Sequence, residues 1–420
     1  MKTKVLPIGL FVLLNCCIPG HSYKQTGGNV TKSNQAFTAK KTDESGVLVR
    51  EGGFLTLENS AITTYGNTSS QESSSFYGLN AGVLSESGSQ IILNNCTVKT
   101  NGTGANGVFA TGKGSSVVLY NDTIICMNEG GHGVDATFEG SLLLNDVYIS
   151  TSGAHGAAIS TDRGGGKIVV NRGQAISSGQ DSPGIYCTGT ITVTNSIIKG
   201  AGAEAAVIEG ANSITLTNTT ITAAEGTRDR GIFIYQSMSG DAMGNKGVFS
   251  MTGGSFLWPS SSGPAFYITN THGIINLSNV AFTNNSALLI KASADQWGTA
   301  GSNGGNVVFT ADNQIVTGDI ISDYLSSVSI SLNNYSSLTG AINKAAITID
   351  GTSTWDVTSD SYITTLSDNE GISGNTITNI KGNGHTVYYD DALSANAYLG
   401  GKTYALTEGG YLKNSISKND

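Results

Sequence analysis

The sequence predicts an all-β fold in which short strands stack coil upon coil into a solenoid. One observation is an internal repeat, because the pattern of residues 184–198 returns at residues 206–221, about one coil later. A second is the alternation of apolar and hydroxyl residues in both copies, which has the period of two typical of a strand. A unit this short cannot bury its apolar side alone, so stacked copies must form the core.

The composition agrees with short strands joined by tight turns. The chain of 420 residues contains 56 Gly and only 5 Pro, and 13% of its residues are charged. Glycine allows the positive φ angles that tight turns need. The net charge of −9 argues against nucleic acid and anionic membrane surfaces as partners, since both favour basic proteins.

Residues 1–22 have the features of a signal peptide. Lysines precede an apolar run over residues 5–14, and small and turn-forming residues follow it. The run is too short to span a bilayer, so we expect a mature chain that is secreted or held at the cell surface and has no transmembrane segment. Cys16 and Cys17 leave open the alternative that a cysteine there is lipid-modified.

Three cysteines remain once that segment is removed: Cys96, Cys126 and Cys187. An odd number of thiols cannot all pair within one chain. We expect these cysteines to be buried and unreactive.

Residues 46–358 are predicted to form the solenoid, after a polar lead or N-terminal cap at residues 23–45. Each coil opens with Gly or Ala followed by apolar residues, and neighbouring starts are most often about 22 to 26 residues apart. This spacing fits three short strands and three turns, and the starts predict about twelve coils without a helix of convincing length. The starts lie at Gly46, Gly82, Gly107, Gly133, Gly156, Gly184, Ala206, Gly231, Ala265 and Ala287, with weaker ones at Asp319 and Ala341.

A second signature, L-x-N-x-x-I, recurs within the coils and places an asparagine at one turn. Asparagine tolerates the left-handed backbone conformation and caps its own turn. We expect the apolar residues on either side to point inward, and the asparagines to stack as a ladder of hydrogen-bonded amides about 4.8 Å apart. The ladder residues are Asn59, Asn95, Asn121, Asn195, Asn218 and Asn279.

Three coils are longer than the rest, through insertions at residues 67–75, 238–246 and 293–305. The last two begin at the same offset from their coil starts and are separated by one intact coil, so we expect them to project from the same side as a shared ledge. Loops displayed by a rigid scaffold often carry function. The candidate binding residues on the ledge are Met238, Asp241, Met243, Asp295, Gln296 and Trp297.

Trp297 is the central residue of this hypothesis. An exposed tryptophan beside Asp295 and Gln296 suits stacking on a sugar ring with polar contacts at its edge. The alternative is that Trp297 folds back and packs on its own loop.

Beyond about residue 359 the repeat dissolves into a segment rich in Tyr and Gly. The end of a solenoid exposes unpaired strand edges and core side chains, which an atypical terminal segment can cover. We therefore interpret residues 359–420 as a C-terminal cap, with a binding module as the alternative.

Together, the coil starts, the asparagine turn and the signal segment resemble the right-handed parallel β-helix of the pectin-lyase-like class. Low charge and a surface rich in Ser, Thr, Asn and Gly make the chain more similar to adhesins and autotransporter passenger regions than to the polysaccharide-degrading members. Residues 282–285 match the F-x-x-N element of polymorphic outer-membrane autotransporters, and residues 156–159 are close to their second element. The segment after the last predicted coil is too short for the membrane barrel of such proteins, so we expect attachment by another route or release.

The enzymes of this class imply clustered charged residues on one outer sheet, and few candidates are visible in the sequence. His132 lies in a Gly-His-Gly turn, but His155 suggests that the same turn recurs one coil later, which favours a turn preference over catalysis. Asp162 and Arg163 and the cluster 228–230 are interpreted as solvated charges at turns, with a carbohydrate-gripping arginine pair as the alternative. No catalytic residue, metal site or cofactor is predicted.

The leading hypothesis is an exported, non-enzymatic β-helix protein that resembles adhesins and binds a glycan or protein partner. One alternative is a carbohydrate-active lyase or hydrolase on the same fold, and another is a structural stalk. A cluster of carboxylates or a Ca²⁺ site on one outer sheet would favour the enzyme, because both cleavage chemistries need such groups.

Overall fold

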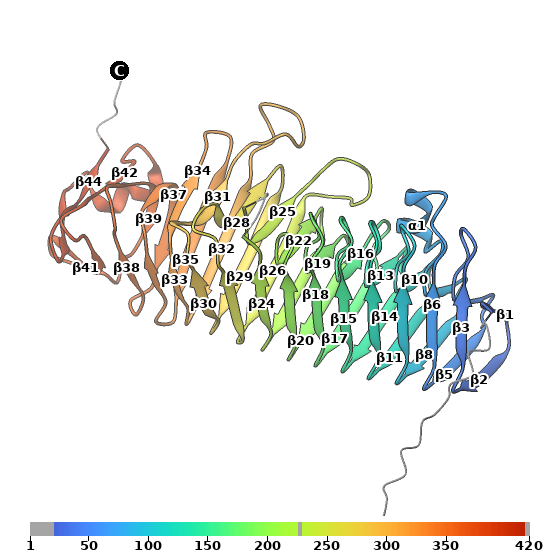
Figure 1. Cartoon of the computed structure of the whole chain (residues 1–420). Coiled ribbons are helices and arrows are strands. Elements are labelled where there is room, and N and C mark those ends of the chain that lie inside the picture. Colours follow the sequence, from blue (N-terminus) through green and yellow to red (C-terminus); the bar gives the residue numbers. More distant parts are fainter. Residues whose placement is uncertain (1–20, 226–228, 416–420) are drawn as a thin grey trace, which may run out of the picture.

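The chain folds as one elongated stack of parallel β-strands (Figure 1). The computed structural model describes residues 21–225 and 229–415, so the predicted signal segment lies almost entirely outside the described residues. Each coil contributes three short strands, and each strand pairs in parallel with the corresponding strand of the next coil. The predicted all-β solenoid is confirmed.

The three strands of each coil form three faces of the stack. Face 1 consists of the strands that open the coils: β1 (Tyr23–Thr26), β4 (Val47–Arg50), β7 (Val83–Glu86), β10 (Val108–Thr111), β13 (Val134–Thr137), β16 (Ile159–Thr161), β19 (Ile185–Cys187), β22 (Ala206–Glu209), β25 (Ile232–Tyr235), β28 (Pro264–Thr269), β31 (Leu288–Ala292) and β34 (Asp319–Ser322). Face 2 consists of β2 (Asn29–Ser33), β5 (Phe54–Glu58), β8 (Gln90–Asn94), β11 (Ser116–Tyr120), β14 (Ser141–Asn145), β17 (Lys167–Asn171), β20 (Thr190–Thr194), β23 (Ser213–Thr217), β26 (Lys246–Thr252), β29 (His272–Ser278), β32 (Asn306–Asp312) and β35 (Ser327–Asn333). Face 3 consists of β3 (Ala36–Ala39), β6 (Ala61–Thr64), β9 (Thr97–Thr100), β12 (Thr123–Cys126), β15 (Tyr148–Thr151), β18 (Gln174–Ser177), β21 (Ile197–Gly200), β24 (Thr220–Ala223), β27 (Ser255–Trp258) and β30 (Ala281–Asn284), followed by β33 (Ile315–Thr317), β36 (Ser337–Thr339) and β38 (Thr354–Asp356).

The stack is longer than predicted, with about 16 coils rather than twelve. At about 4.8 Å per coil, 16 coils give a rod about 75 Å long. One additional coil is β1 to β3, which pair with β4 to β6 of the next coil. The sequence pattern missed it because Lys32 stands where later coils have an apolar residue before the turn asparagine, here Asn34.

The remaining coils lie in the C-terminal segment. Face 1 continues through β37 (Ile342–Ile349), β39 (Ser361–Ser367), β42 (Thr386–Tyr389) and β44 (Tyr411–Asn414), all paired in parallel. Two antiparallel pairs interrupt this pattern: β40 (Ile372–Ser373) with β41 (Thr376–Lys381), and β43 (Tyr404–Thr407) with β44. A short 3₁₀ helix, η1 (Ser394–Leu399), lies beside β39.

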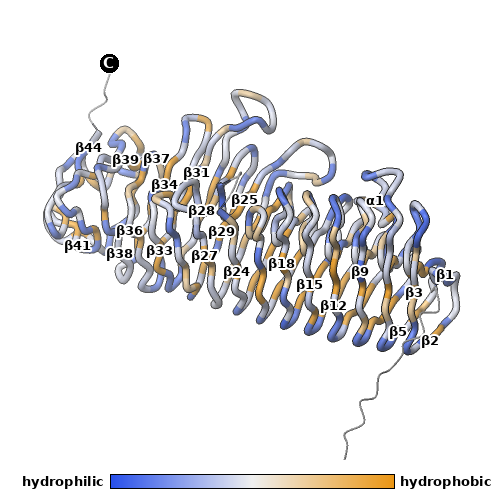
Figure 2. The backbone as a smooth tube through the Cα atoms, in the orientation of Figure 1, coloured by the Kyte–Doolittle hydropathy of each residue, from blue (hydrophilic) through white to orange (hydrophobic). Residues whose placement is uncertain are grey.

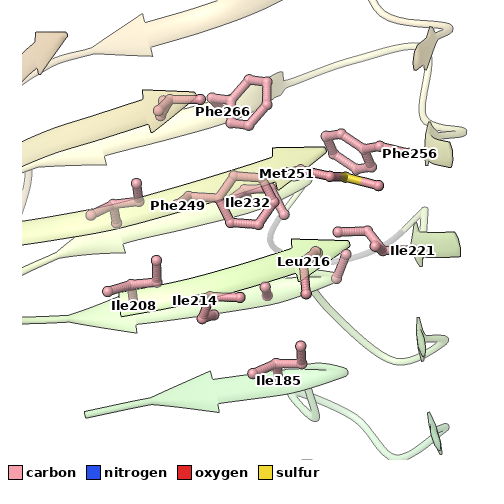
Figure 3. Close-up of a cluster of buried hydrophobic side chains, with 14 of the residues drawn as sticks. Ile185, Ile208, Ile214, Leu216, Ile221, Ile232, Phe249, Met251, Phe256 and Phe266 are labelled. Atoms are coloured by element: carbon pink, nitrogen blue, oxygen red, sulfur yellow. The ribbon is translucent and has the colours of Figure 1, made fainter. Parts of the chain in front are cut away.

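The core is a narrow apolar column between the three faces, with hydrophilic residues at the turns (Figure 2). Figure 3 shows how the faces meet, with Leu216 and Met251 of face 2 beside Ile221 and Phe256 of face 3. Each of these side chains is almost fully buried. Cys96, Cys126 and Cys187 are buried free thiols within this column, as predicted.

Lack of space explains why the coils open with Gly or Ala. A Cβ atom on Gly107 would lie 2.4 Å from Cγ2 of Ile124 and 2.4 Å from the carbonyl oxygen of Gly133. Gly46, Gly82 and Gly133 face a β-branched side chain of face 3 in the same way. Glycine at these positions therefore allows the branched core residue to fill the corner between face 3 and face 1.

The structure contains one short α-helix among the described residues, α1 (Gln71–Tyr77), which begins within the first predicted insertion and ends two residues beyond it. Ser70 caps its start by accepting a hydrogen bond from the backbone N–H of Ser73, and Gly78 ends it in the left-handed conformation. The helix lies over the outer side of face 1, where the carbonyl oxygen of Phe76 accepts a hydrogen bond from Thr137.

Candidate functional site

In the middle of the stack, most outward side chains of face 1 are buried, unlike those of faces 2 and 3. Strands alternate between core and surface, yet every residue of β10, β13, β22 and β25 is buried. Helix α1 and the two ledge loops, residues 238–246 and 293–305, supply part of this cover. The outward residues stand in register in the order Leu84, Phe109, Asp135, Ser160, Tyr186, Val207, Phe233, Tyr267 and Lys291.

Glu209 is a buried carboxylate at the centre of this surface, with only 2% of the residue exposed. The hydroxyl groups of Tyr186 and Tyr235 donate hydrogen bonds to it at 2.7 and 2.8 Å, and Ser237 donates a third. Burial and the nearby carboxylate raise the pKa of both tyrosines, so they remain protonated donors. The side chain of Glu209 is therefore held by neutral hydroxyl groups.

A second acidic group lies two to three coils away, where His132, Asp135 and Asp162 each place a possible ligand atom within 4.8 Å of the others. Burial raises the pKa of Asp162 to about 7. Burial, and then the neighbouring Asp162, raise the pKa of Asp135 well above its ordinary value. The interpretation of Asp162 as a solvated turn charge is wrong, because only 9% of this residue is exposed.

The imidazole of His132 is neutral and its tautomer is fixed. Burial lowers its pKa to about 4. Its Nδ1 atom accepts a hydrogen bond of 3.0 Å from the backbone N–H of Ala157, so its single proton lies on Nε2.

The register corrects the comparison of His132 with His155. Gly133 precedes Val134, which pairs with Ile159, so His132 corresponds to Ala157 and not to His155. His155 is exposed and has a φ of 57°, whereas His132 is buried. The two histidines therefore do not share a turn preference.

Arg163 joins two of the elements that cover face 1. Its Nε and Nη2 atoms lie 3.0 and 2.6 Å from one carboxylate oxygen of Asp241 on the first ledge loop. Arg163 also contacts two residues of α1. Its Nη1 atom lies 3.6 Å from the carboxylate of Glu72, and its guanidinium lies 3.8 Å from the centre of the Phe76 ring. Arg163 thus bridges α1 and the first ledge loop next to Asp162.

A cluster of aromatic rings continues the surface toward the second ledge loop. The ring of Phe233 stacks on Tyr235 and Tyr267 at centroid distances of 4.3 and 5.6 Å. Arg230 lies 3.5 Å above Phe233 and forms a 2.6 Å ion pair with the buried Glu204. A cleft of about 260 Å³ opens beside these rings, lined by Asp229, Arg230, Gly263, Pro264, Tyr267, Lys291 and Asp295.

The two ledge loops leave the same corner of the coil, between face 1 and face 2 (Figure 1). Asn270, in the intact coil between them, connects them. Its Nδ2 atom donates to the carbonyl oxygen of Gln236 at 2.6 Å, and Nε2 of Gln236 donates to the carbonyl oxygen of Ala242 in the first loop at 3.0 Å. The backbone N–H of Asn270 donates to the carbonyl oxygen of Asn303 in the second loop at 3.0 Å. The expected shared ledge is therefore present as one hydrogen-bonded unit.

The ledge residues divide into two groups. Asp241 pairs with Arg163, Asp295 accepts a 2.8 Å hydrogen bond from Tyr267, and Trp297 packs on Tyr235 at 5.2 Å, so three of the candidates reach face 1. The other three lie toward solvent: Met238 is 70% exposed, Met243 is 86% exposed, and Gln296 is exposed. Trp297 is half-buried and reaches beyond its own loop to the aromatic cluster.

Other candidates have different positions. Arg228 lies outside the described residues, and Arg230 packs over Phe233 as described. The six asparagines of the predicted ladder all have positive φ angles and lie between face 2 and face 3, on another edge of the stack: Asn59, Asn95, Asn121, Asn195, Asn218 and Asn279. Among the described turn asparagines, one direct amide contact is present, from Nδ2 of Asn313 to Oδ1 of Asn279 at 2.5 Å.

Sequence reasoning missed Asp135, Glu209, Tyr186 and Tyr267. Each stands at an outward strand position, where a polar or aromatic residue is ordinary in an alternating pattern. The available signal was the coil-to-coil alignment: Asp135 replaces the Phe109 of the preceding coil in an otherwise similar strand.

No model of a known protein family matches the sequence, and no curated protein matches it. Within residues 21–225 and 229–415, no helix has the length and apolar character needed to cross a membrane.

Proposed function

We propose that this protein is exported and binds a carbohydrate on the outer surface of face 1, beside the ledge. The observation that carries the proposal is the cleft of about 260 Å³, whose lining includes the ring of Tyr267, two acidic side chains and two basic side chains. Sugar sites combine an aromatic wall with a few polar groups that hold hydroxyls. Trp297 adds a half-buried ring next to the same cluster.

The charges on face 1 favour a neutral or cationic glycan. Carboxylates outnumber cationic groups around the middle of face 1 and the cleft: Asp135, Asp162, Glu204, Glu209, Asp229, Asp241 and Asp295 stand against Arg163, Arg230 and Lys291. Together with the net charge of −9, this composition disfavours acidic polysaccharides through like-charge repulsion.

The second candidate function is glycan cleavage. The specific observation in its favour is the set of carboxylates Asp135, Asp162 and Glu209 on one outer face, because a cluster of carboxylates on one outer sheet favours an enzyme. These groups are covered, with exposed fractions of 0, 9 and 2%. Binding at the open cleft is therefore the better supported function.

The test is binding of the purified mature chain, residues 23–420, to a broad array of neutral, amino and acidic glycans while the same glycans are followed for cleavage. We expect binding of neutral or amino sugars without cleavage. Lys291→Ala and Trp297→Ala should weaken it, whereas Tyr335→Ala, which removes an exposed aromatic ring between face 2 and face 3, should not. Cleavage would support the second function, and wild-type binding by both face 1 variants would refute the proposed site.

A further inference from the structure

Three oxygen atoms on face 1 make no hydrogen bond of ordinary geometry with any described residue. They are both carboxylate oxygens of Asp135 and the hydroxyl oxygen of Ser160. Asp135 on β13 and Ser160 on β16 are paired in register, so their side chains are outward neighbours on adjacent strands. Both residues are fully buried.

Each of the other buried carboxylates that the structure describes accepts at least one hydrogen bond. Glu209 accepts hydrogen bonds from the hydroxyl groups of two tyrosines and two serines. Asp122 accepts two backbone N–H bonds, from Cys96 at 2.6 Å and Tyr120 at 2.9 Å. A buried carboxylate without partners is strongly unfavourable. Asp135 is therefore an exception that calls for a ligand of its own.

Asp162 supplies further oxygens to the same place. Its carboxylate lies within 4.8 Å of that of Asp135. Oδ1 of Asp162 accepts the backbone N–H of Arg163 at 2.8 Å, which leaves a lone pair on that oxygen. Glu209 and Asp241 are close enough to Asp162 to repel its negative charge, and Arg163 is the cation that offsets them. The surroundings therefore favour a positive ligand.

We propose that Asp135, Asp162 and Ser160 bind a hard divalent cation, Ca²⁺, on the outer surface of face 1. Two carboxylates and one hydroxyl offer up to five oxygen ligands, and carboxylate and hydroxyl oxygens are the donors that Ca²⁺ takes in proteins. Ca²⁺ suits a covered site better than Mg²⁺, which sheds its water reluctantly.

His132 determines the class of metal. The lone pair of Nδ1 is used by the N–H of Ala157, and Nε2 carries the proton, so neither nitrogen is free to bind a metal. A site without an available nitrogen or thiolate ligand does not select Zn²⁺ or Cu²⁺. His132 borders the site and is not one of its ligands.

The test is calorimetric titration of the full mature chain with Ca²⁺ alone, after removal of metals with a chelator and without any glycan. We expect one saturable site and a higher unfolding temperature with Ca²⁺. Asp135→Asn, which keeps the shape of the side chain, should abolish saturable binding, and Ser160→Ala should weaken it about tenfold. Asp391→Asn, which removes an exposed carboxylate of the C-terminal segment, is the matched control and should bind as the wild type does.

Absence of saturable Ca²⁺ binding by the wild type would overturn the proposal, as would wild-type affinity in Asp135→Asn. Circular dichroism checks that each variant is folded. If Asp135→Asn does not fold, the decision rests on Ser160→Ala, where unchanged affinity rejects the site. Because no glycan is present, the result is independent of the proposed carbohydrate binding.

Discussion

Asp122 links the stability of this protein to pH. Asp122 lies at the turn between β11 and β12 and is only 1% exposed. Burial raises the pKa of its carboxyl group to about 7, although the carboxyl group accepts two hydrogen bonds from backbone N–H groups. The unfolded chain has the ordinary value of about 3.9. The folded state therefore binds this proton more tightly, and its contribution to stability falls as pH rises from about 4 to about 7.

We expect protonation of Asp122 to contribute up to about 4 kcal/mol to the free energy of unfolding, and this contribution is lost across the pH window. The figure follows from a pKa difference of about three units between the folded and unfolded states, at 1.36 kcal/mol per unit. Asp122→Asn cannot titrate, so its free energy of unfolding should fall less between pH 4.5 and 7.5 than that of the wild type. Urea denaturation at several pH values measures both slopes. Parallel slopes would show that Asp122 has an ordinary pKa in the folded protein.

Asn218 tests the asparagine turn. Its φ of 48° lies in the left-handed region, which a β-branched residue adopts only with strain. Asn218→Val should lower the free energy of unfolding by about 1 to 3 kcal/mol. Asn218→Gly, which accepts the same φ, is the matched control and should lose much less. Equal losses in the two variants would mean that side-chain contacts, and not the backbone conformation, select asparagine here.

The turn is the part of each coil that single residues predict best. Asn, Asp and Gly recur there because few residues accept a positive φ, and the structure has a positive φ at all of the predicted positions. Arg172 also adopts this conformation, with a φ of 55°, although arginine carries no such signal. There, its guanidinium pairs with Asp146 of the preceding coil at 2.8 Å. A contact between coils is invisible until the register is known.

At the level of the element, Gly107 tests the packing at the start of a coil. A methyl group there would meet Ile124 and the backbone of Gly133, both at 2.4 Å. Gly107→Ala should therefore destabilise the protein by about 1 to 3 kcal/mol, the usual cost of overpacking. Ala205 occupies the equivalent position before β22, so Ala205→Gly should cost about 1 kcal/mol or less. Chemical denaturation compares the two, and a stable Gly107→Ala variant would show that the corner can widen.

The strands could be predicted from the sequence, but the covered face could not. Alternation identifies which residues point outward, and it assigns Asp135 to the surface. The cover over that surface comes from elements distant in the chain, as in the contact between Arg163 and Asp241, which are 78 residues apart. The insertions were recognisable by their length, so Asp241, Asp295 and Trp297 were proposed, whereas the residues beneath them were not.

For the whole molecule, each coil contacts mainly its two neighbouring coils, so the two ends of the stack must cover core side chains and strand edges that no further coil covers. The predicted period of the solenoid held across the middle, where every coil repeats the same three strands. It failed near the ends because end coils have a neighbour on one side only and need other side chains to close the core. Trp355, fully buried in β38, and the antiparallel pairs of the C-terminal segment have no counterpart in the repeat.

Removal of the C-terminal segment should therefore convert the protein into an associating species. A chain ending at Asp360 loses β39 to β44, which exposes the edges of β37 and β38 and uncovers Trp355, whose strand pairs with β41. Unpaired edges of this kind recruit strands from other chains. We expect oligomers by light scattering and a lower unfolding temperature, whereas deletion of residues 1–22 alone should leave a monomer. If the chain ending at Asp360 stays monomeric and keeps the full unfolding temperature, the coils up to β38 close their own end. The C-terminal segment would then not be needed as a cap, and the alternative that it is a binding module would be favoured.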